Sequence, residues 1–192
     1  MPPEEIIERL AAGFAELFTR DGELFDLGLH GVHEQTITFR LGFYLQSLFA
    51  THHVDCEYNR VWDQTKGCEL TGIDSMKPDV IVHRRTCDAE NLVCIEAKKH
   101  NLWNDPDIGY ASIERKLVAL TRLDGVYRYP VGLAWQIMPT LNRAEHSVFW
   151  FTQGQQFHAS CLVNFEARLL HALRAFDALR SSRRSSPSRP EG

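Results

Sequence analysis

The stretch "KPDVIVHRRTCDAENLVCIEAKKH", residues 77–100, consists of two apolar segments joined by a polar turn. The segments "PDVIVHRR" and "NLVCIEAKK" are rich in β-branched residues, and "TCDAE" between them has the composition of a turn. We therefore expect an antiparallel hairpin. Three charged residues, Asp79, Glu96 and Lys98, lie near its open end, and their position in such apolar strands needs a physical reason.

The turn fixes the register of this hairpin. In an antiparallel pair the numbers of facing residues have a constant sum, so a turn centred between positions 87 and 88 places Asp79 opposite Glu96. Alternation along the strand puts Lys98 on the same side. The other side carries apolar residues, which are Val80, Val82, Val93, Ile95 and Ala97. Both faces are apolar except at this end, which is typical of a central strand covered by helices on both sides.

Two facing carboxylates at this position suit a divalent cation. Facing Cβ atoms lie roughly 5 Å apart, which lets Asp79 and Glu96 share one ion with bonds of about 2.1 Å for magnesium. Without a cation the pair would repel, and one carboxyl group would tend to be protonated. Lys98 offsets part of the charge and can reach the same reaction centre. The sequence thus predicts a metal site for Mg²⁺, or for Mn²⁺ in its place.

The rest of the chain predicts one α/β domain over residues 1–180 and a disordered basic tail over 181–192. Helices are expected over residues 2–18, 32–50, 105–123 and 164–180. Further strands are expected over residues 53–62, 127–138 and 146–153, and a loop over 63–77. This order predicts a mixed central sheet flanked by helices, in which a helical crossover creates a parallel strand pair.

Within this order of elements, "PDVIVH" followed by "CIEAKK" resembles the signature of the PD-(D/E)XK nuclease superfamily, which has the restriction-endonuclease-like fold. The resemblance spans roughly residues 33–137 and implies an αβββαβ core. The first helix, a C-terminal strand and the last helix would be additions to it. In that family the matching positions make Asp79 and Glu96 metal ligands, and Lys98 orients or activates the attacking water. An acidic residue on the preceding helix often completes such sites, and Glu34 is carried over as a catalytic residue and third metal ligand.

The resemblance implies a divalent-metal-dependent endonuclease that hydrolyses DNA phosphodiester bonds, with duplex DNA favoured and RNA left open. It also allows a homodimer, since many nucleases of this type cut two strands as dimers. The net charge of −4 argues against nonspecific coating of nucleic acid, so a metal or a local basic patch would be needed. The alternatives are a noncatalytic nucleic-acid-binding or complex-forming module with this fold, and an enzyme that acts on another substrate through the same metal.

Each candidate residue also has a purely structural interpretation. Asp79 could be an ordinary strand-entry residue, and Glu96 with Lys98 an exposed pair on the sheet surface. Glu34 could be a first-turn glutamate favoured by the helix dipole. Lys116, next to the apolar stripe of the helix after the hairpin, is expected to be a solvated flanking residue.

Composition sets the expected location. Five cysteines are scattered without zinc-site spacing, which favours free thiols in a reducing compartment. The acidic, amphipathic start is unlike a signal peptide, and no apolar run approaches membrane-spanning length. We therefore expect a cytoplasmic protein without membrane contact.

Overall fold

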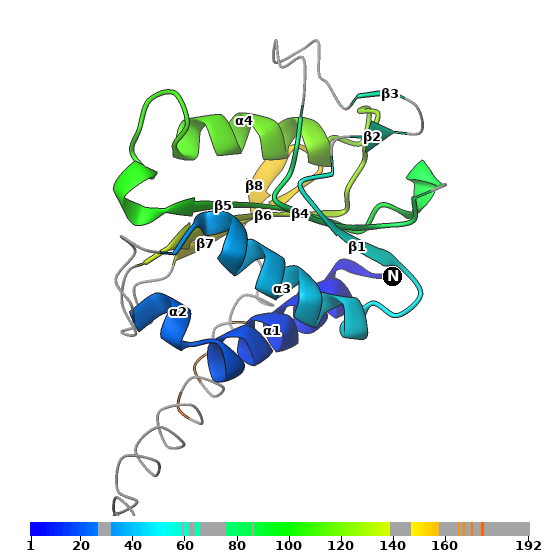
Figure 1. Ribbon diagram of the computed structural model, residues 1–192. Coiled ribbons are helices and arrows are strands. Elements are labelled where there is room, and N and C mark those ends of the chain that lie inside the picture. The colour runs from blue at the N-terminus through cyan, green and yellow to red at the C-terminus, as the bar shows by residue number, and fades with distance from the viewer. Residues whose placement is uncertain are drawn as a thin grey trace, which may run out of the picture.

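Figure 1 shows the computed structural model of the chain. The residues that it describes are 1–26, 32–58, 60–61, 64–65, 76–85, 87–138, 147–157, 165, 167, 170 and 174. The α-helices bounded within them are α1 (Pro3–Arg20), α2 (Glu23–Asp26), α3 (Glu34–Leu48) and α4 (Tyr110–Thr121). Short 3₁₀ helices cover η2 (Asp88–Glu90) and η3 (His100–Leu102). The strands are β1 (His53–Cys56), β2 (Arg60–Val61), β3 (Gln64–Thr65), β4 (Val80–His83), β5 (Val93–Lys99), β6 (Val131–Ile137), β7 (Ser147–Thr152) and β8 (Gln155–Phe157).

The main sheet has six strands in the order β1-β4-β5-β6-β7-β8. Strands β5 and β6 are parallel, and the other neighbouring pairs are antiparallel. The helix α4 forms the crossover between the parallel strands, which a short turn could not make. The predicted fold class, a mixed α/β domain with a sheet flanked by helices, is confirmed.

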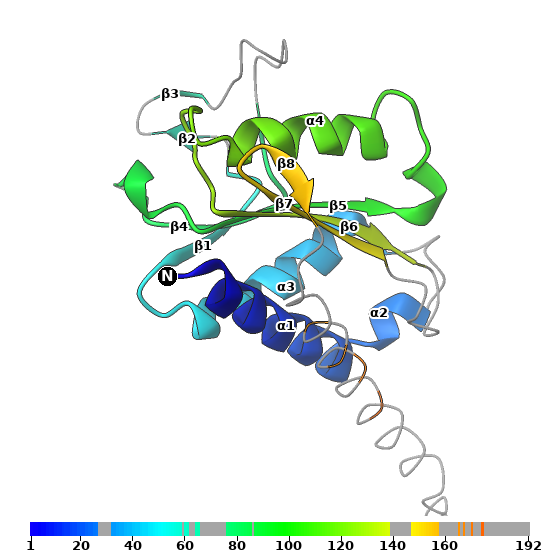
Figure 2. The same ribbon diagram turned by 180° about the vertical axis from the view of Figure 1, so that it is seen from behind.

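Helices cover both faces of this sheet. Figures 1 and 2 show α1, α2 and α3 against one face and α4 against the other. Two apolar clusters correspond to these layers: Val80 and Ile95 pack in the larger one with α1 and α3, and Ile81 and Cys94 pack in the smaller one with α4. The facing residues Val80 and Ile95 have the predicted partnership. The hairpin register and its two apolar faces are therefore confirmed.

The first helix anchors the larger cluster. Its predicted apolar stripe is buried, and the members are Ile6, Ile7, Leu10, Phe14, Leu17 and Phe18. Phe14 meets Trp135 of β6 edge to face, with ring centroids 4.8 Å apart. Such a contact stabilises an aromatic pair beyond its buried area. The helix α1 is thus part of the core. None of the described helices is long and apolar enough to cross a membrane.

The expected strand over residues 53–62 is wrong in extent. Strand β1 ends at Cys56, because Glu57 has a positive φ of 52° that turns the chain out of the sheet. Strand β2 then pairs with β3 in a separate two-stranded sheet, and β3 lies inside the segment predicted as a loop. Short polar strands of this kind carry no periodic apolar signal.

The expected start of the helix at Asp105 is also wrong. Asp105 instead closes a turn: its Oδ1 accepts hydrogen bonds from the backbone N–H groups of Asp107 and Ile108 at 2.9 and 3.1 Å. The helix α4 begins only at Tyr110. An aspartate followed by proline suits both a helix start and a tight turn, and here the turn forms.

Two further elements were not predicted, and one prediction is largely untested. The helix α2 lies in a segment read as turns, and β8 follows β7 through a tight turn in which Gln153 and Gly154 both have positive φ, 52° and 74°. That turn geometry is the one that joins short hairpins, and glycine favours it.

Of the expected closing helix, the described residues 165, 167, 170 and 174 are helical. The predicted tail over 181–192 lies outside the described residues.

A charged cluster fastens the edge strand β1 to β4. Asp55 accepts a hydrogen bond from Arg85 Nε at 2.9 Å and contacts His83 Nε2 at 2.8 Å. The Tyr58 ring lies tilted against the His83 ring, with centroids 4.9 Å apart and an interplanar angle of 56°. Burial raises the pKa of Asp55, but the hydrogen bonds from Arg85 and His83 outweigh it and hold that pKa below the ordinary 3.8.

We therefore expect Asp55→Asn to lose about 1–3 kcal/mol of unfolding free energy at neutral pH. A carboxyl group with a lowered pKa stabilises the fold above its unfolded pKa, and that stability is lost as the pH falls through the folded pKa. The difference in unfolding free energy between wild type and variant, measured by urea unfolding, should thus be largest above about pH 5 and should decrease below pH 4. Asp124→Asn, which removes an exposed pair with Arg122, is the control and should change little. A gap that widens in acid would contradict this account.

Candidate active site

The four residues singled out in the sequence come from three elements that meet at one end of the hairpin. Glu34 is the first residue of α3, and Asp79 immediately precedes β4. Glu96 and Lys98 lie in β5. Since the pairing of Val80 with Ile95 is the last of the β4–β5 register at this end, Asp79 is adjacent to Glu96 across the two strands.

Asp79 is held by the backbone of the facing strand. Its Oδ2 accepts a hydrogen bond from the N–H group of Ala97 at 2.7 Å. Its own carbonyl oxygen accepts a hydrogen bond from the backbone N–H of Glu57 at 3.1 Å. The carboxylate is therefore oriented by the main chain of β5, while the backbone of Asp79 is held by the segment that follows β1.

Glu34 is bound to the end of β5. Its Oε1 accepts a hydrogen bond from Lys98 Nζ at 2.9 Å, and its Oε2 accepts one from the backbone N–H of Lys99 at 3.0 Å. Both side chains of the ion pair are about one-fifth exposed. Glu34 thus joins α3 to β5, whereas a glutamate serving only the helix dipole would need no such partner.

Glu96 is a buried carboxylate with a lysine partner from the opposite layer. The residue is only 4% exposed, so the interpretation as an exposed surface pair is wrong. Lys116 of α4 donates a hydrogen bond from Nζ to Glu96 Oε2 at 3.1 Å. The expectation that Lys116 is a solvated flanking residue is therefore also wrong. Its position next to the apolar stripe of α4 brings it over the sheet.

Burial and a neighbouring negative charge perturb the pKa of both acids. Burial raises the pKa of Glu96 to about 8, and the charge of Asp79 adds to the rise while Lys116 opposes it. Burial raises the pKa of Asp79 to about 6, the hydrogen bond from Ala97 opposes this rise, and the charge of Glu34 adds to it.

The pKa of Lys98, the lysine of the motif, is also raised, but for a lysine this favours the charged form. Burial alone would lower the pKa of Lys98, but the hydrogen bond and charge of Glu34 outweigh burial and raise it. The ammonium form is therefore favoured at this end of β5. The site as a whole combines three carboxyl groups with the ammonium groups of Lys98 and Lys116.

The acids fit a divalent ion in part. Glu96 Oε1 is buried and has no hydrogen-bond partner among the described residues, which leaves a carboxylate oxygen open for a cation. Asp79 is its neighbour, and hard divalent ions prefer carboxylate oxygens. Within the described segments, however, no three His, Cys, Asp or Glu side chains are arranged to hold a metal. Glu34 is committed to Lys98 instead, so Asp79 and Glu96 are the residues that fit.

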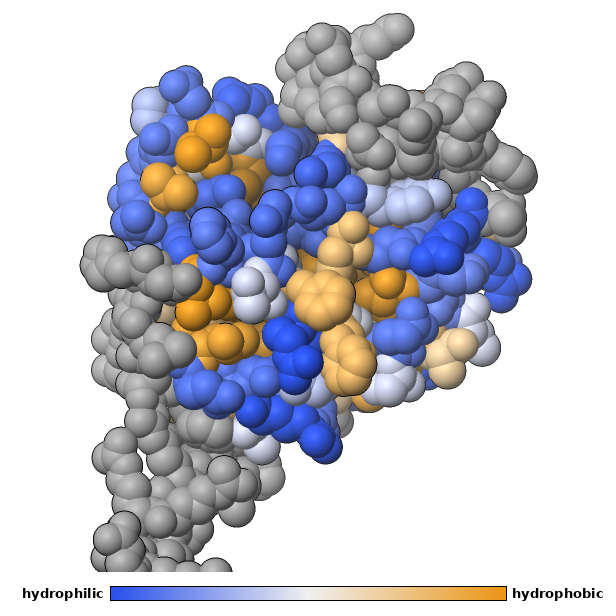
Figure 3. Space-filling model, viewed as in Figure 1, coloured by the Kyte–Doolittle hydropathy of each residue, from blue (hydrophilic) through white to orange (hydrophobic). Residues whose placement is uncertain are grey.

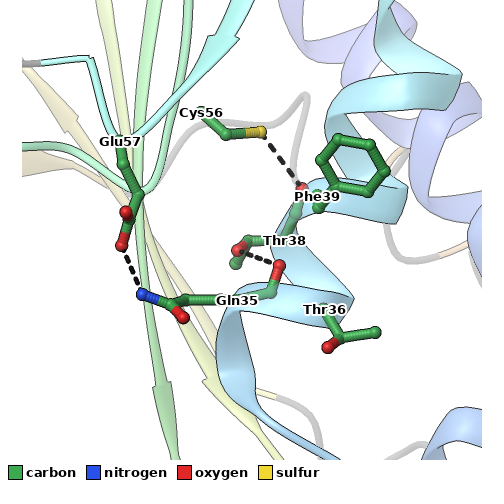
Figure 4. A pocket seen from close by; sticks show the side chains of 6 residues that line it. All are labelled: Gln35, Thr36, Thr38, Phe39, Cys56 and Glu57. Carbon is green, nitrogen blue, oxygen red and sulfur yellow. Dashed lines mark hydrogen bonds between the residues drawn. The ribbon is translucent and has the colours of Figure 1, made fainter.

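A hollow lies beside the site, between α3 and β1. It has a volume of about 400 Å³ and is lined by Gln35, Thr36, Thr38, Phe39, Cys56 and Glu57. Figure 4 shows Gln35 reaching Glu57, which it contacts at 2.7 Å. On the same helix Phe39 and Phe43 are 59% and 61% exposed, and Figure 3 shows apolar residues near the middle of this face. The surface next to Glu34 is thus mixed in character, with amide, acid and aromatic groups.

Comparisons with protein-family models, with curated proteins and with solved structures found no match for this chain. The function is therefore inferred from the residues of the site. The decisive feature is the buried carboxylate of Glu96 beside Asp79 at a strand end, because convergent charged groups with shifted pKa values are typical of functional sites.

Proposed function

We propose that this protein is a divalent-metal-dependent nuclease that hydrolyses DNA phosphodiester bonds and resembles the PD-(D/E)XK superfamily. The αβββαβ core would consist of α3, β1, β4, β5, α4 and β6, with α1, β7 and β8 as additions. One observation carries the proposal: the buried carboxylate of Glu96, with an oxygen that has no partner in the described part of the chain, lies beside Asp79. A buried carboxylate oxygen without a partner is costly unless a ligand uses it.

Asp79 and Glu96 are the residues that would hold the ion, with Mg²⁺ expected and Mn²⁺ able to replace it. When bound, the ion supplies positive charge that offsets the charge developing on the scissile phosphate and makes a nearby water more acidic. Glu34 would join as a third ligand only on release from Lys98. Because Ala97 N–H orients Asp79 through a 2.7 Å hydrogen bond, the strand backbone sets the position of this ligand in advance.

Lys98 would orient the attacking water or the phosphate. Its ammonium is placed at the end of β5 by the 2.9 Å contact with Glu34. A cation fixed in this way stabilises negative charge without first reorganising its surroundings. Glu34 would then act as a positioning residue for Lys98, which is a role that its two hydrogen bonds to β5 support.

The substrate class follows from charge. With a net charge of −4 the chain has no general affinity for a polyanion, and a bound cation would reverse the sign of the potential at the site. DNA binding should therefore depend on the metal more than on the rest of the surface. Duplex DNA is the favoured form of substrate, and a homodimer would allow both strands to be cut.

The direct test is a cleavage assay. In about 5 mM Mg²⁺ or Mn²⁺, the protein should cut at least one of supercoiled plasmid, linear duplex and single-stranded DNA. An excess of EDTA should stop the cleavage. An RNA of the same sequence decides between the two nucleic acids. Absence of cleavage on every substrate with both metals would refute the proposal.

A second candidate is a noncatalytic nucleic-acid-binding or complex-forming module with this fold. It is favoured by the two ion pairs, Glu34 with Lys98 and Glu96 with Lys116, which neutralise most of the site without a metal. Binding of DNA that does not depend on Mg²⁺, without cleavage, would support this candidate over the nuclease.

A further inference from the structure

Lys116 brings a second ammonium group to the site from the opposite layer of the fold. Its Nζ lies 3.1 Å from Glu96 Oε2. The side chain of Glu96 is 5% exposed and that of Lys116 is 26% exposed, so the contact is largely shielded from water. An ion pair in this environment is stronger than one on the surface, since screening is weak there.

The two lysines of the site have different partners. Lys98 donates to Glu34, whereas Lys116 donates to Glu96, one of the two acids that fit a metal. The remaining oxygen of Glu96 has no partner among the described residues. Lys116 therefore occupies one oxygen of the carboxylate whose other oxygen is open to an ion between Glu96 and Asp79.

We propose that Lys116 is an exchangeable counter-ion, which neutralises Glu96 while no metal is bound and transfers to a phosphate oxygen of the substrate when a divalent ion takes its place. This inference rests on the proposed nuclease function. It adds a phosphate-binding residue that lies outside the sequence motif.

The chemistry of the parts favours exchange. A divalent ion and an ammonium on the same carboxylate repel each other, and the repulsion is large where the dielectric constant is low. The helix α4 itself is fixed, because Ile113, Leu117 and Leu120 are buried in the cluster that covers the sheet. The lysine side chain has a flexible four-carbon stem, so Nζ can move while the helix stays in place. The nearest new anion would be the substrate phosphate.

Metal binding without DNA tests the first half. We expect Lys116→Met to bind Mg²⁺ about tenfold more tightly than wild type in calorimetric titrations, with each protein compared at an alkaline pH above which its affinity no longer rises. Methionine keeps the apolar stem but removes the charge. Lys116→Arg should stay close to wild type. Arg115→Met, which removes an exposed charge one residue earlier on α4, is the matched control and should change the affinity by less than about twofold.

Cleavage at saturating Mg²⁺ tests the second half. Lys116→Met should lower kcat/KM for DNA by about tenfold to a hundredfold, because a phosphate contact is lost although the metal binds better. A lysine with a merely structural role would not tighten metal binding when removed. Equal or weaker Mg²⁺ binding by Lys116→Met overturns the inference, and so does tighter binding with undiminished cleavage. Absence of Mg²⁺ binding in the wild type overturns the proposed function as well, which separates the two failures.

Discussion

Asp79→Asn should reduce metal-dependent cleavage by about a thousandfold or more and leave the fold intact. The asparagine side chain keeps an oxygen that can accept the hydrogen bond from Ala97 N–H, which in the wild type is 2.7 Å long. It loses the negative charge that a divalent ion requires. A loss of about 4 kcal/mol of transition-state stabilisation corresponds to this fall in rate.

The measurement is kcat/KM on the DNA substrate that the wild type cuts best, with circular dichroism as the check on folding. Asp107→Asn is the matched control, because Asp107 is exposed on the turn before α4 and makes no contact with the site. It should cleave like the wild type. An Asp79→Asn protein with more than a tenth of wild-type activity would remove Asp79 from the metal site.

Lys98→Ala should lower kcat by about a hundredfold to a thousandfold with Mg²⁺ present in excess. The ammonium of Lys98 is the charged group nearest to Glu34, and its loss removes the positive charge that would orient water or phosphate. Glu34 keeps its hydrogen bond from the backbone N–H of Lys99, so the link between α3 and β5 survives the change.

Lys99→Ala provides the control for Lys98→Ala. It removes the side chain of the next residue, which alternation along the strand directs to the opposite side of the sheet. The backbone N–H of residue 99 that donates a hydrogen bond to Glu34 is kept. We expect it to retain most of the activity. Full activity of Lys98→Ala, or an equal loss in the two variants, would show that the motif lysine has no specific part in the reaction.

The sequence was sufficient for the hairpin and for the layers that cover it. Strands β4 and β5 are strongly apolar and are joined by a short turn, so their register and faces follow from counting. The buried stripe of α1 was readable for the same reason, since helical periodicity is a strong signal over eighteen residues. Elements that depend on a pairing partner, such as β3 and β8, were missed because propensity alone does not determine short strands.

The site was only partly readable. The proximity of Asp79 and Glu96 follows from register. The resemblance suggested Glu34 as a metal ligand, and its contact with Lys98 was not predicted because it depends on how α3 packs. Lys116 could not be placed, because its contact depends on where α4 begins and on its rotation above the sheet. A helix start at Asp105 in place of Tyr110 would add more than one turn at the N-terminal end of α4.

The most direct test of the shared-cation claim is a crystal structure of the protein soaked in Mn²⁺, read by anomalous scattering. We predict a peak within bonding distance, about 2.2 Å, of carboxylate oxygens from both Asp79 and Glu96. The claim would be contradicted by a structure at high Mn²⁺ with no peak between Asp79 and Glu96, in which Asp79 still accepts its hydrogen bond from Ala97 N–H and Glu96 still accepts one from Lys116.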